Sequence, residues 1–319
     1  MHDVNRQNTI LAILGPTASG KSALAFNIAK EINAEIISAD SRQIYRELNI
    51  GSAKPSPETL REIKHHFINE LSIGDPFTAG DFARQASKRI HSILQSGKNA
   101  IIAGGSTLYL EALLYGFADL PPSDTEKRKQ LAIELETLGS RHLFERLRKL
   151  DPQQAATLDH TKTHRMVRSL EIIELSGLTV SEMQKKHIQP LAGINVITCG
   201  LSLPRPLLYE RINQRTDQML ASGLLQEAKS LFTKYSPCGD VITTNALQTV
   251  GYQELFAYLD GKTDFMRAIT LIKQHTRNYA KRQLTFFKNR LNVNWVEAPD
   301  NEHELSVLTA SCCRMITEN

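Results

Sequence analysis

Short apolar runs and amphipathic helical patterns alternate along the first part of the chain. Strands are predicted at Thr9–Leu14, Glu35–Ser38 and Ala100–Ala103, and helices at Ser22–Glu31 and Asp81–Gln95. Apolar runs separated by helical patterns are typical of a parallel sheet whose strands are joined by right-handed crossovers. We therefore predict an α/β fold in which helices flank a parallel sheet.

The pattern changes after Leu120-Pro121-Pro122, where the prolines end the preceding helical pattern. From Asp124 to about Gln189 every pattern is helical, and a strand is predicted again at Ile194–Leu201. We expect an all-helical insertion domain at residues 118–194, placed within a core formed by residues 1–117 and 195–319.

The last third of the chain is mostly helical. Helices are predicted at Pro206–Ala221, Leu224–Phe232, Tyr252–Leu259 and Thr263–Lys288, with a short strand at Val293–Val296 and a final helix from about Glu302. We expect these helices to extend the α/β core.

The helix predicted at Thr263–Lys288 lies in a basic stretch. Eight Lys or Arg residues occur between Lys262 and Arg290, against one acid, Asp264. One arc of about 80° holds basic residues, and another of about 100° holds apolar ones. With almost no acids on this helix, we expect no ion-pair partners for the basic arc, which is either a solvated face or a site for a polyphosphate such as RNA. The basic arc holds Lys273, Arg277, Lys281 and Lys288, and the apolar arc Phe265, Ile269, Ile272, Tyr279, Phe286 and Phe287.

Composition narrows the class of protein. With 319 residues, 41% hydrophobic and 23% charged, the chain is neither disordered nor collagen-like, and its net charge of +4 does not by itself indicate a nucleic-acid partner. The longest apolar runs span about five residues, far from the roughly 20 that cross a bilayer. The polar start lacks a signal-peptide core, and the four cysteines form no C-x-x-C pair. We expect a cytoplasmic protein with reduced thiols and no membrane partner.

A phosphate-binding motif follows the first predicted strand. Gly15-Pro16-Thr17-Ala18-Ser19-Gly20-Lys21-Ser22 matches G-x-x-x-x-G-K-[ST] and opens the first helix. The glycines let backbone N–H groups point inward, Lys21 supplies a charge to the terminal phosphate, and the Ser22 hydroxyl can ligate Mg²⁺. ATP is the default ligand of this motif. No Asn-Lys-x-Asp motif for guanine is present, which disfavours a GTPase.

Two polar residues follow the next strands. Asp40 ends the second strand, so it should face the phosphates, where it can hold Mg²⁺ through water, act as a general base, or cap a turn. The third strand runs into Gly104-Gly105 and Ser106. This segment is either a tight turn with a helix cap or a hydroxyl that points into the site.

Together these motifs resemble the bacterial tRNA dimethylallyltransferase family, the isopentenyltransferases that modify adenosine 37 beside the tRNA anticodon. The matching segments follow in order over nearly the whole chain. They are Gly15–Ser22, Ile37–Arg46, Ile50–Pro55, His65-His66, Gly104–Leu110, Arg211–Arg215, Val250–Tyr252 and Tyr279–Thr285.

The resemblance implies a P-loop NTPase-like core with a helical insertion that grips tRNA. It also implies that Gly15–Ser22 hold the diphosphate of dimethylallyl diphosphate with Mg²⁺, in place of ATP, and that the dimethylallyl group passes to adenine N6 with release of pyrophosphate. The expected partners are dimethylallyl diphosphate and a tRNA anticodon stem-loop, bound by a monomer.

The resemblance also carries over individual residues. Asp40, Ser106 and Arg215 match catalytic positions. The family usually has threonine where this chain has Ser106, and often has arginines where it has Gln248 and Gln253. Positions that match tRNA contacts are Asp40, Ser41, Arg42, Gln43, Ser106, Arg128, Arg165, Arg168, Gln248, Gly251, Tyr252, Gln253, Lys281, Arg282, Gln283 and Lys288.

Three other functions remain open from the sequence. The first is an ATP-dependent small-molecule or nucleoside kinase on the same core. The second is a prenyltransferase that acts on free adenine nucleotides, although such a substrate needs neither the helical insertion nor the basic helix. The third is a non-catalytic P-loop protein that binds RNA.

Overall fold

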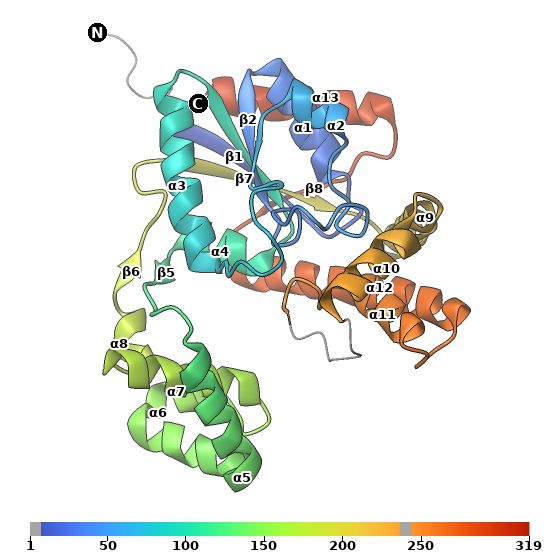
Figure 1. The fold of residues 1–319 in the computed structure, drawn as a ribbon. Helices are drawn as coiled ribbons and strands as arrows, with labels where there is room; N and C mark the ends of the chain where they lie inside the picture. The colour runs from blue at the N-terminus through green and yellow to red at the C-terminus, as the bar shows by residue number, and fades with distance from the viewer. Residues whose placement is uncertain (1–7, 237–243, 319) are drawn as a thin grey trace. The chain divides into compact units, whose positions relative to one another are not determined.

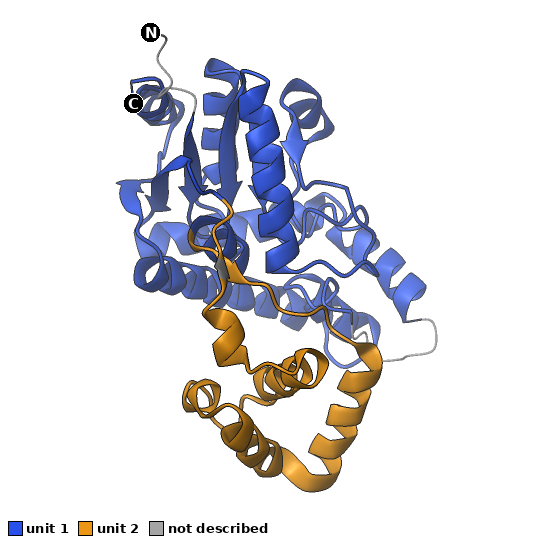
Figure 2. Ribbon diagram, turned by 90° about the vertical axis from the view of Figure 1, so that its left-hand side faces the viewer, with its two compact units in different colours: residues 1–114, 191–319 blue, residues 115–190 orange. Residues whose placement is uncertain are grey.

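The structure, a computed structural model, describes residues 8–236 and 244–318. Cys238 and the polar start of the chain lie outside these residues. The chain divides into two compact units, one made of residues 1–114 and 191–319 and the other of residues 115–190 (Figure 2). The second unit therefore interrupts the first, over nearly the stretch that the sequence predicts as an insertion.

A six-stranded sheet forms the centre of the first unit. Its strand order is β3-β2-β4-β1-β7-β8, and every neighbouring pair is parallel, which confirms the predicted fold class. All residues of β1 and β2 are buried, as expected for strands covered on both faces. The strands are β1 (Thr9–Leu14), β2 (Ala34–Ala39), β3 (His65–His66), β4 (Asn99–Gly104), β7 (Asn195–Ser202) and β8 (Asn294–Glu297).

Helices cover both faces of this sheet (Figure 1). On one face, α1 (Lys21–Glu31) and α13 (Glu302–Thr317) pack against alternate residues of the strands, in one cluster that includes Leu11, Ile28 and Ile316. On the other lies α3 (Ala79–Gln95), which begins with a capping box at Thr78. Two shorter helices, α2 (Pro57–Glu62) and α4 (Thr107–Tyr115), complete this part.

Four further helices of the first unit gather beyond the sheet (Figure 1). The longest is α12, whose Ala280 packs with Leu208 and Ile212 of α9. α10 and α11 lie side by side and complete the group. The helices are α9 (Arg205–Ala221), α10 (Leu224–Tyr235), α11 (Tyr252–Leu259) and α12 (Phe265–Arg290), within a few residues of the predicted bounds.

The basic arc of α12 has partners that its own sequence does not reveal. Lys273 Nζ lies 2.6 Å from Asp217 Oδ1, and Arg277 donates to Asn213 Oδ1 at 2.8 Å. The expectation that no acid pairs with this arc was therefore wrong for Lys273, because the partner lies on α9. Tyr279, expected on the buried face, is 38% exposed.

The second unit is helical apart from a short antiparallel pair, β5 (Phe117–Ala118) with β6 (His187–Ile188). Runs of two residues are too short for a hydrophobic pattern to predict, which explains why the sequence indicated helices alone. The helices enclose a core of their own that includes Leu131, Leu147 and Leu170. They are α5 (Thr125–Leu150, interrupted at Gly139 with φ 82°), α6 (Pro152–Ala156), α7 (Thr163–Ser176) and α8 (Val180–Gln184).

Among the described residues, no helix combines the length and the hydrophobicity that a membrane crossing requires. Cys199, Cys312 and Cys313 are free thiols.

Candidate functional site

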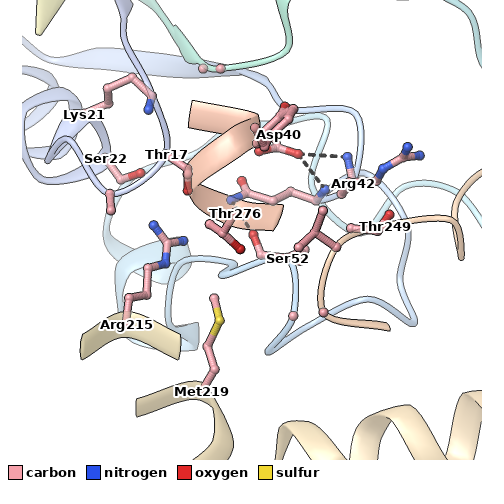
Figure 3. Close-up of a pocket in the computed structure, with 18 of the residues that line it drawn as sticks. Thr17, Lys21, Ser22, Asp40, Arg42, Ser52, Arg215, Met219, Thr249 and Thr276 are labelled. Carbon is pink, nitrogen blue, oxygen red and sulfur yellow. Dashed lines mark hydrogen bonds between the residues drawn. The ribbon is translucent and has the colours of Figure 1, made fainter. Parts of the chain in front are cut away.

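A cavity opens in the first unit at the carboxyl ends of β1, β2 and β4, where ligands gather in open α/β sheets (Figure 3). The phosphate-binding loop contributes Thr17, Lys21 and Ser22, and the end of β2 contributes Asp40. α9 contributes Arg215 from a distant part of the sequence. The fold therefore brings three groups of predicted site residues into one cavity.

The loop from Gly15 to Gly20 has the geometry of a phosphate cradle. A Cβ on Gly15 would lie 3.0 Å from the Leu201 carbonyl oxygen and 3.0 Å from Ser19 Oγ, so the tight approach requires glycine. Gly20 has a φ of 90° and precedes α1, whose first turn has no side-chain cap. The uncapped N–H groups and the helix dipole make this end of α1 suitable for an anion.

Lys21 and Arg215 place two cations at this cavity. Burial, and secondarily the neighbouring Arg215, lower the pKa of Lys21 to about 7, although Asp40 opposes the shift. Burial also lowers the pKa of Arg215. Lys21 Nζ donates to the Pro16 carbonyl at 2.5 Å, and within the described residues neither cation forms an ion pair. Because charges that are partly removed from water are costly without a partner, this half-buried pair indicates an anionic ligand.

Asp40 caps the turn that follows β2. Its Oδ1 accepts hydrogen bonds from the backbone N–H groups of Arg42 at 2.8 Å and Gln43 at 3.3 Å (Figure 3). Of the roles that the sequence left open, the structure thus shows the cap. The cap also fixes the orientation of a carboxylate beside the cavity, which is what a general base or a metal ligand needs.

Ser106 lies behind the cavity wall. It is 8% exposed, and its Oγ accepts from Ser41 N at 2.8 Å and donates to Ser41 Oγ at 3.2 Å. The preceding Gly104 is required by packing, because a Cβ there would lie 2.2 Å from the Ala39 carbonyl oxygen. The Ser106 hydroxyl therefore fastens the loop after β2 to the end of β4, and the cavity-facing residues of this turn are Gly104 and Gly105.

Two residues predicted to contact tRNA are buried and form hydrogen bonds within the protein. Gln283, 2% exposed, accepts from Thr17 N through Oε1 at 2.9 Å and donates through Nε2 to Gly105 O at 2.8 Å. Tyr252 is fully buried, and its hydroxyl donates to Glu227 Oε1 at 2.5 Å. Gln283 thus joins the phosphate-binding loop to the turn after β4.

Two of the three predicted arginines of the second unit contact a buried carboxylate. Glu171 has no exposed surface and accepts from Arg128 Nε at 3.1 Å, Arg168 Nη1 at 2.8 Å and Asp124 N at 2.7 Å. Burial would raise the pKa of Glu171, but these hydrogen bonds outweigh it and lower the pKa. Arg128 and Arg168 therefore support the fold of this unit, although Arg128, like Arg165, is exposed.

The other predicted tRNA residues lie in the first unit. Ser41 and Gly251 are close to the cavity, as are Arg42 and Gln43, and Arg42 also donates to Asn245 Oδ1 at 3.3 Å. The exposed residues of this group are Gln248, Gln253, Lys281, Arg282 and Lys288. The exposed side chains offer cations and hydrogen-bonding groups to an outside partner.

Sequence reasoning missed several cavity-lining residues. One face of α12 lines the cavity with Ile272, Thr276 and Tyr279, which form one helical stripe with the predicted Gln283. That spacing was visible in the sequence, but the residues differ in polarity, so no hydrophobic pattern reveals it. Other lining residues without a local signal are Ser38, Ser52, Met219 and Thr249.

Comparison with known proteins identifies the family. The family model described as IPP transferase matches residues 43–290. The chain belongs to this family. The tRNA dimethylallyltransferase of Chlorobium phaeobacteroides (strain DSM 266) is 86% identical over all 319 residues, covering both chains completely. The tRNA dimethylallyltransferase of Chlorobium limicola is 60% identical over 313 residues, 98% of each chain.

Solved structures agree with this membership. The full-length tRNA isopentenylpyrophosphate transferase of Bacillus halodurans is 33% identical, with a TM-score of 0.69 over 98% of this chain and 97% of that one. A eukaryotic dimethylallyltransferase described as acting on tRNA is 26% identical, with a TM-score of 0.82 over 98% of this chain and 80% of that one. The family therefore shares the P-loop-like core across distant relatives.

Proposed function

We propose that the protein is a tRNA dimethylallyltransferase, which transfers the dimethylallyl group of dimethylallyl diphosphate to N6 of adenosine 37 and releases pyrophosphate. The observation that carries the proposal is the cavity in which Lys21 and Arg215, two half-buried cations without an ion pair among the described residues, lie together with Asp40. Relatives that are named tRNA dimethylallyltransferase match this chain over nearly their whole length, and this supports the reaction class.

The diphosphate of the donor fits the phosphate-binding loop. The N–H groups at the start of α1 can donate hydrogen bonds to the diphosphate, and Lys21 and Arg215 face it with two positive charges. As the bond to the allylic carbon breaks, negative charge grows on the departing pyrophosphate, and preorganised cations stabilise that charge. The loop and the two cations thus bind the donor and favour its cleavage.

Mg²⁺ fits the oxygen donors of this site. The Ser22 hydroxyl at the start of α1 and the Asp40 carboxylate both face the cavity, and oxygen ligands are what Mg²⁺ prefers beside phosphates. We propose that Ser22 ligates the ion, which would neutralise charge on the diphosphate.

Asp40 is the proposed base. The N6 lone pair of adenine is delocalised into the ring, so the amino group becomes a useful nucleophile only when its proton is accepted as the new bond forms. The hydrogen bonds from Arg42 and Gln43 hold one carboxylate oxygen and orient the other. Ser106 acts on this arrangement through Ser41, which it positions beside Asp40.

The adenosine must leave its stack to reach this cavity, as target bases do in other base-modifying enzymes. We propose that Lys281, Arg282 and Lys288 contact phosphates of the anticodon stem-loop, while Gln248 and Gln253 contribute uncharged hydrogen bonds. The second unit, with its exposed Arg165, would grip the same RNA. We further propose that the enzyme works as a monomer in the cytoplasm, which the free thiols suit.

One labelling experiment tests the proposal. The protein is incubated with Mg²⁺, labelled dimethylallyl diphosphate and either unmodified tRNA or AMP. We expect label in the tRNA, lost when adenosine 37 is replaced by guanosine, and none in AMP. Label in AMP would instead indicate a nucleotide prenyltransferase. If neither acceptor is labelled and ATP is hydrolysed to transfer phosphate, the protein is a kinase.

A further inference from the structure

One wall of the cavity is a loop without regular structure. Gly51, Ser52 and Pro55 face the cavity from this segment, which follows the Asp40 turn. A loop that lines a reaction site needs fixed hydrogen bonds, since its backbone has no helix or sheet to hold it. Side chains from outside the loop bind its backbone groups.

A single carboxylate on α10 holds the start of this loop. Glu227 Oε2 accepts from Asn49 N at 3.2 Å and Ile50 N at 2.9 Å. Glu227 Oε1 accepts from Gly51 N at 3.0 Å and from the Tyr252 hydroxyl at 2.5 Å. Each oxygen therefore takes two donors. An amide in the same place would turn an NH₂ group toward two of these donors, so only a carboxylate satisfies all four.

The fourth donor connects the loop to a second wall segment. Tyr252 begins α11 directly after Thr249, Val250 and Gly251, which also face the cavity. The hydroxyl end of its ring lies close against Gly51, where a Cβ would come within 2.5 Å of Tyr252 Cζ. Glu227 thus binds both segments and fixes their separation.

The loop is joined to Asp40 at its other end. Gln43 Nε2 donates to the carbonyls of Ser52 at 3.3 Å and Ala53 at 3.1 Å. The backbone N–H of the same Gln43 donates to Asp40 Oδ1 at 3.3 Å. A displacement of the loop therefore reaches the Asp40 turn through one side chain, whereas the phosphate-binding loop has separate supports such as Gln283.

We propose that Glu227 is a positioning residue for the transfer reaction: its carboxylate holds the Asn49–Pro55 wall and the Thr249–Gly251 wall at the separation that places the acceptor against Asp40. The inference rests on the proposed function above. It assigns Glu227 to the alignment of the acceptor and leaves donor diphosphate binding to Lys21 and Arg215. Misplacing reacting groups slightly is costly to turnover even when binding persists.

The test compares Glu227→Gln with wild type in three measurements: steady-state transfer to tRNA, calorimetric binding of inorganic diphosphate with Mg²⁺, and hydrogen exchange in a peptide that covers residues 46–55. We expect kcat to fall at least about tenfold, with diphosphate affinity within about twofold of wild type. Exchange at Asn49, Ile50 and Gly51 should be at least about tenfold faster, since their acceptor is impaired. Glu227→Asp, which keeps four acceptor positions, should recover part of the lost kcat.

Gln226→Ala is the matched control, because the side chain of this exposed neighbour on α10 forms no hydrogen bond among the described residues, and it should leave all three measurements unchanged. If Glu227→Gln does not fold, Tyr252→Phe removes one donor and should lower kcat about threefold. Normal kcat in a folded Glu227→Gln, or equal losses of kcat and diphosphate affinity, would overturn the inference. A wild-type protein that transfers no label would instead contradict the proposed function, while the exchange result would still report whether the loop is held.

Discussion

Lys21 and Arg215 face the cavity without an ion pair among the described residues, whereas Arg128 and Arg168 share the buried carboxylate of Glu171. Lys21, Arg215 and Arg168 are half-buried and Arg128 is exposed, and all four were predicted to be site residues. The two sets differ in their surroundings. A cation that is already neutralised by a carboxylate of the protein supports the fold, while a half-buried cation without a counter-ion indicates that a ligand supplies the charge.

Asp40 should produce the largest effect, because among the residues that the structure describes it is the one carboxylate that lines the cavity with these cations. Asp40→Asn keeps an oxygen that can cap the turn but removes the base, so turnover should fall about 10²- to 10⁴-fold with tRNA affinity near wild type. Single-turnover transfer and filter binding measure the two quantities. The control is Asp75→Ala, because Asp75 caps a turn outside the cavity, where it accepts from Ser72 N at 2.7 Å. This substitution should leave turnover and tRNA affinity unchanged. Full turnover in Asp40→Asn would show that Asp40 caps the turn and is not the base.

The second-largest effect is expected from substitution of Arg215. Arg215→Met removes one of the two cations and should lower kcat/KM for dimethylallyl diphosphate about 10²-fold, as the loss of a preorganised charge at a leaving group does. Arg211→Met is the control, since Arg211 on the same helix pairs with Asp300 at 2.6 Å. Equal effects of the two substitutions on initial rates would remove the distinction between paired and unpaired cations.

Lys21 should make donor binding depend on pH. Its pKa is lowered to about 7 mainly by burial, so the ammonium loses its proton above that pH when no ligand is bound. A bound diphosphate favours the charged form and raises the pKa, so binding takes up a proton. The affinity should fall by up to about tenfold per pH unit above pH 7. Calorimetry between about pH 6.5 and 8.5 measures this fall. The Lys21→Met variant should lack the part of the slope due to Lys21, and an identical slope would contradict the assignment.

The exposed cations of α12 should have the smallest effect. Lys281→Ala should weaken tRNA binding a few-fold and lower the slope of log affinity against log salt by roughly 0.7–0.9, the contribution of one phosphate contact. The double variant Lys273→Ala/Asp217→Ala removes a neutral pair and should change the slope little. If Lys281→Ala leaves the slope unchanged, this face of α12 is a solvated surface that does not contact tRNA phosphates.

Local patterns were sufficient for the features that depend on neighbouring residues. The motif Gly15–Ser22 and the strands before Asp40 and Gly104 could be predicted, because a buried strand and the turn after it are encoded in adjacent positions. Parallel strands then bring these turns to one edge, which is why Lys21 and Asp40 share a cavity.

Contacts between distant segments could not be predicted in this way. Nothing around Glu227 indicates that it binds the backbone at Asn49–Gly51, and the basic run on α12 does not reveal Asp217 on α9. Gln283 matched a tRNA-binding position, yet its amide is satisfied inside the protein. In each case the partner is chosen by packing between elements, which the sequence around one residue does not describe.

A crystal structure of the protein with inorganic diphosphate and Mg²⁺ tests the central claim most directly. The account predicts diphosphate between the start of α1 and Arg215, with the Lys21 ammonium moved from the Pro16 carbonyl to a phosphate oxygen. Diphosphate bound instead at Arg128 and Arg168, with Lys21 still on Pro16, would contradict it.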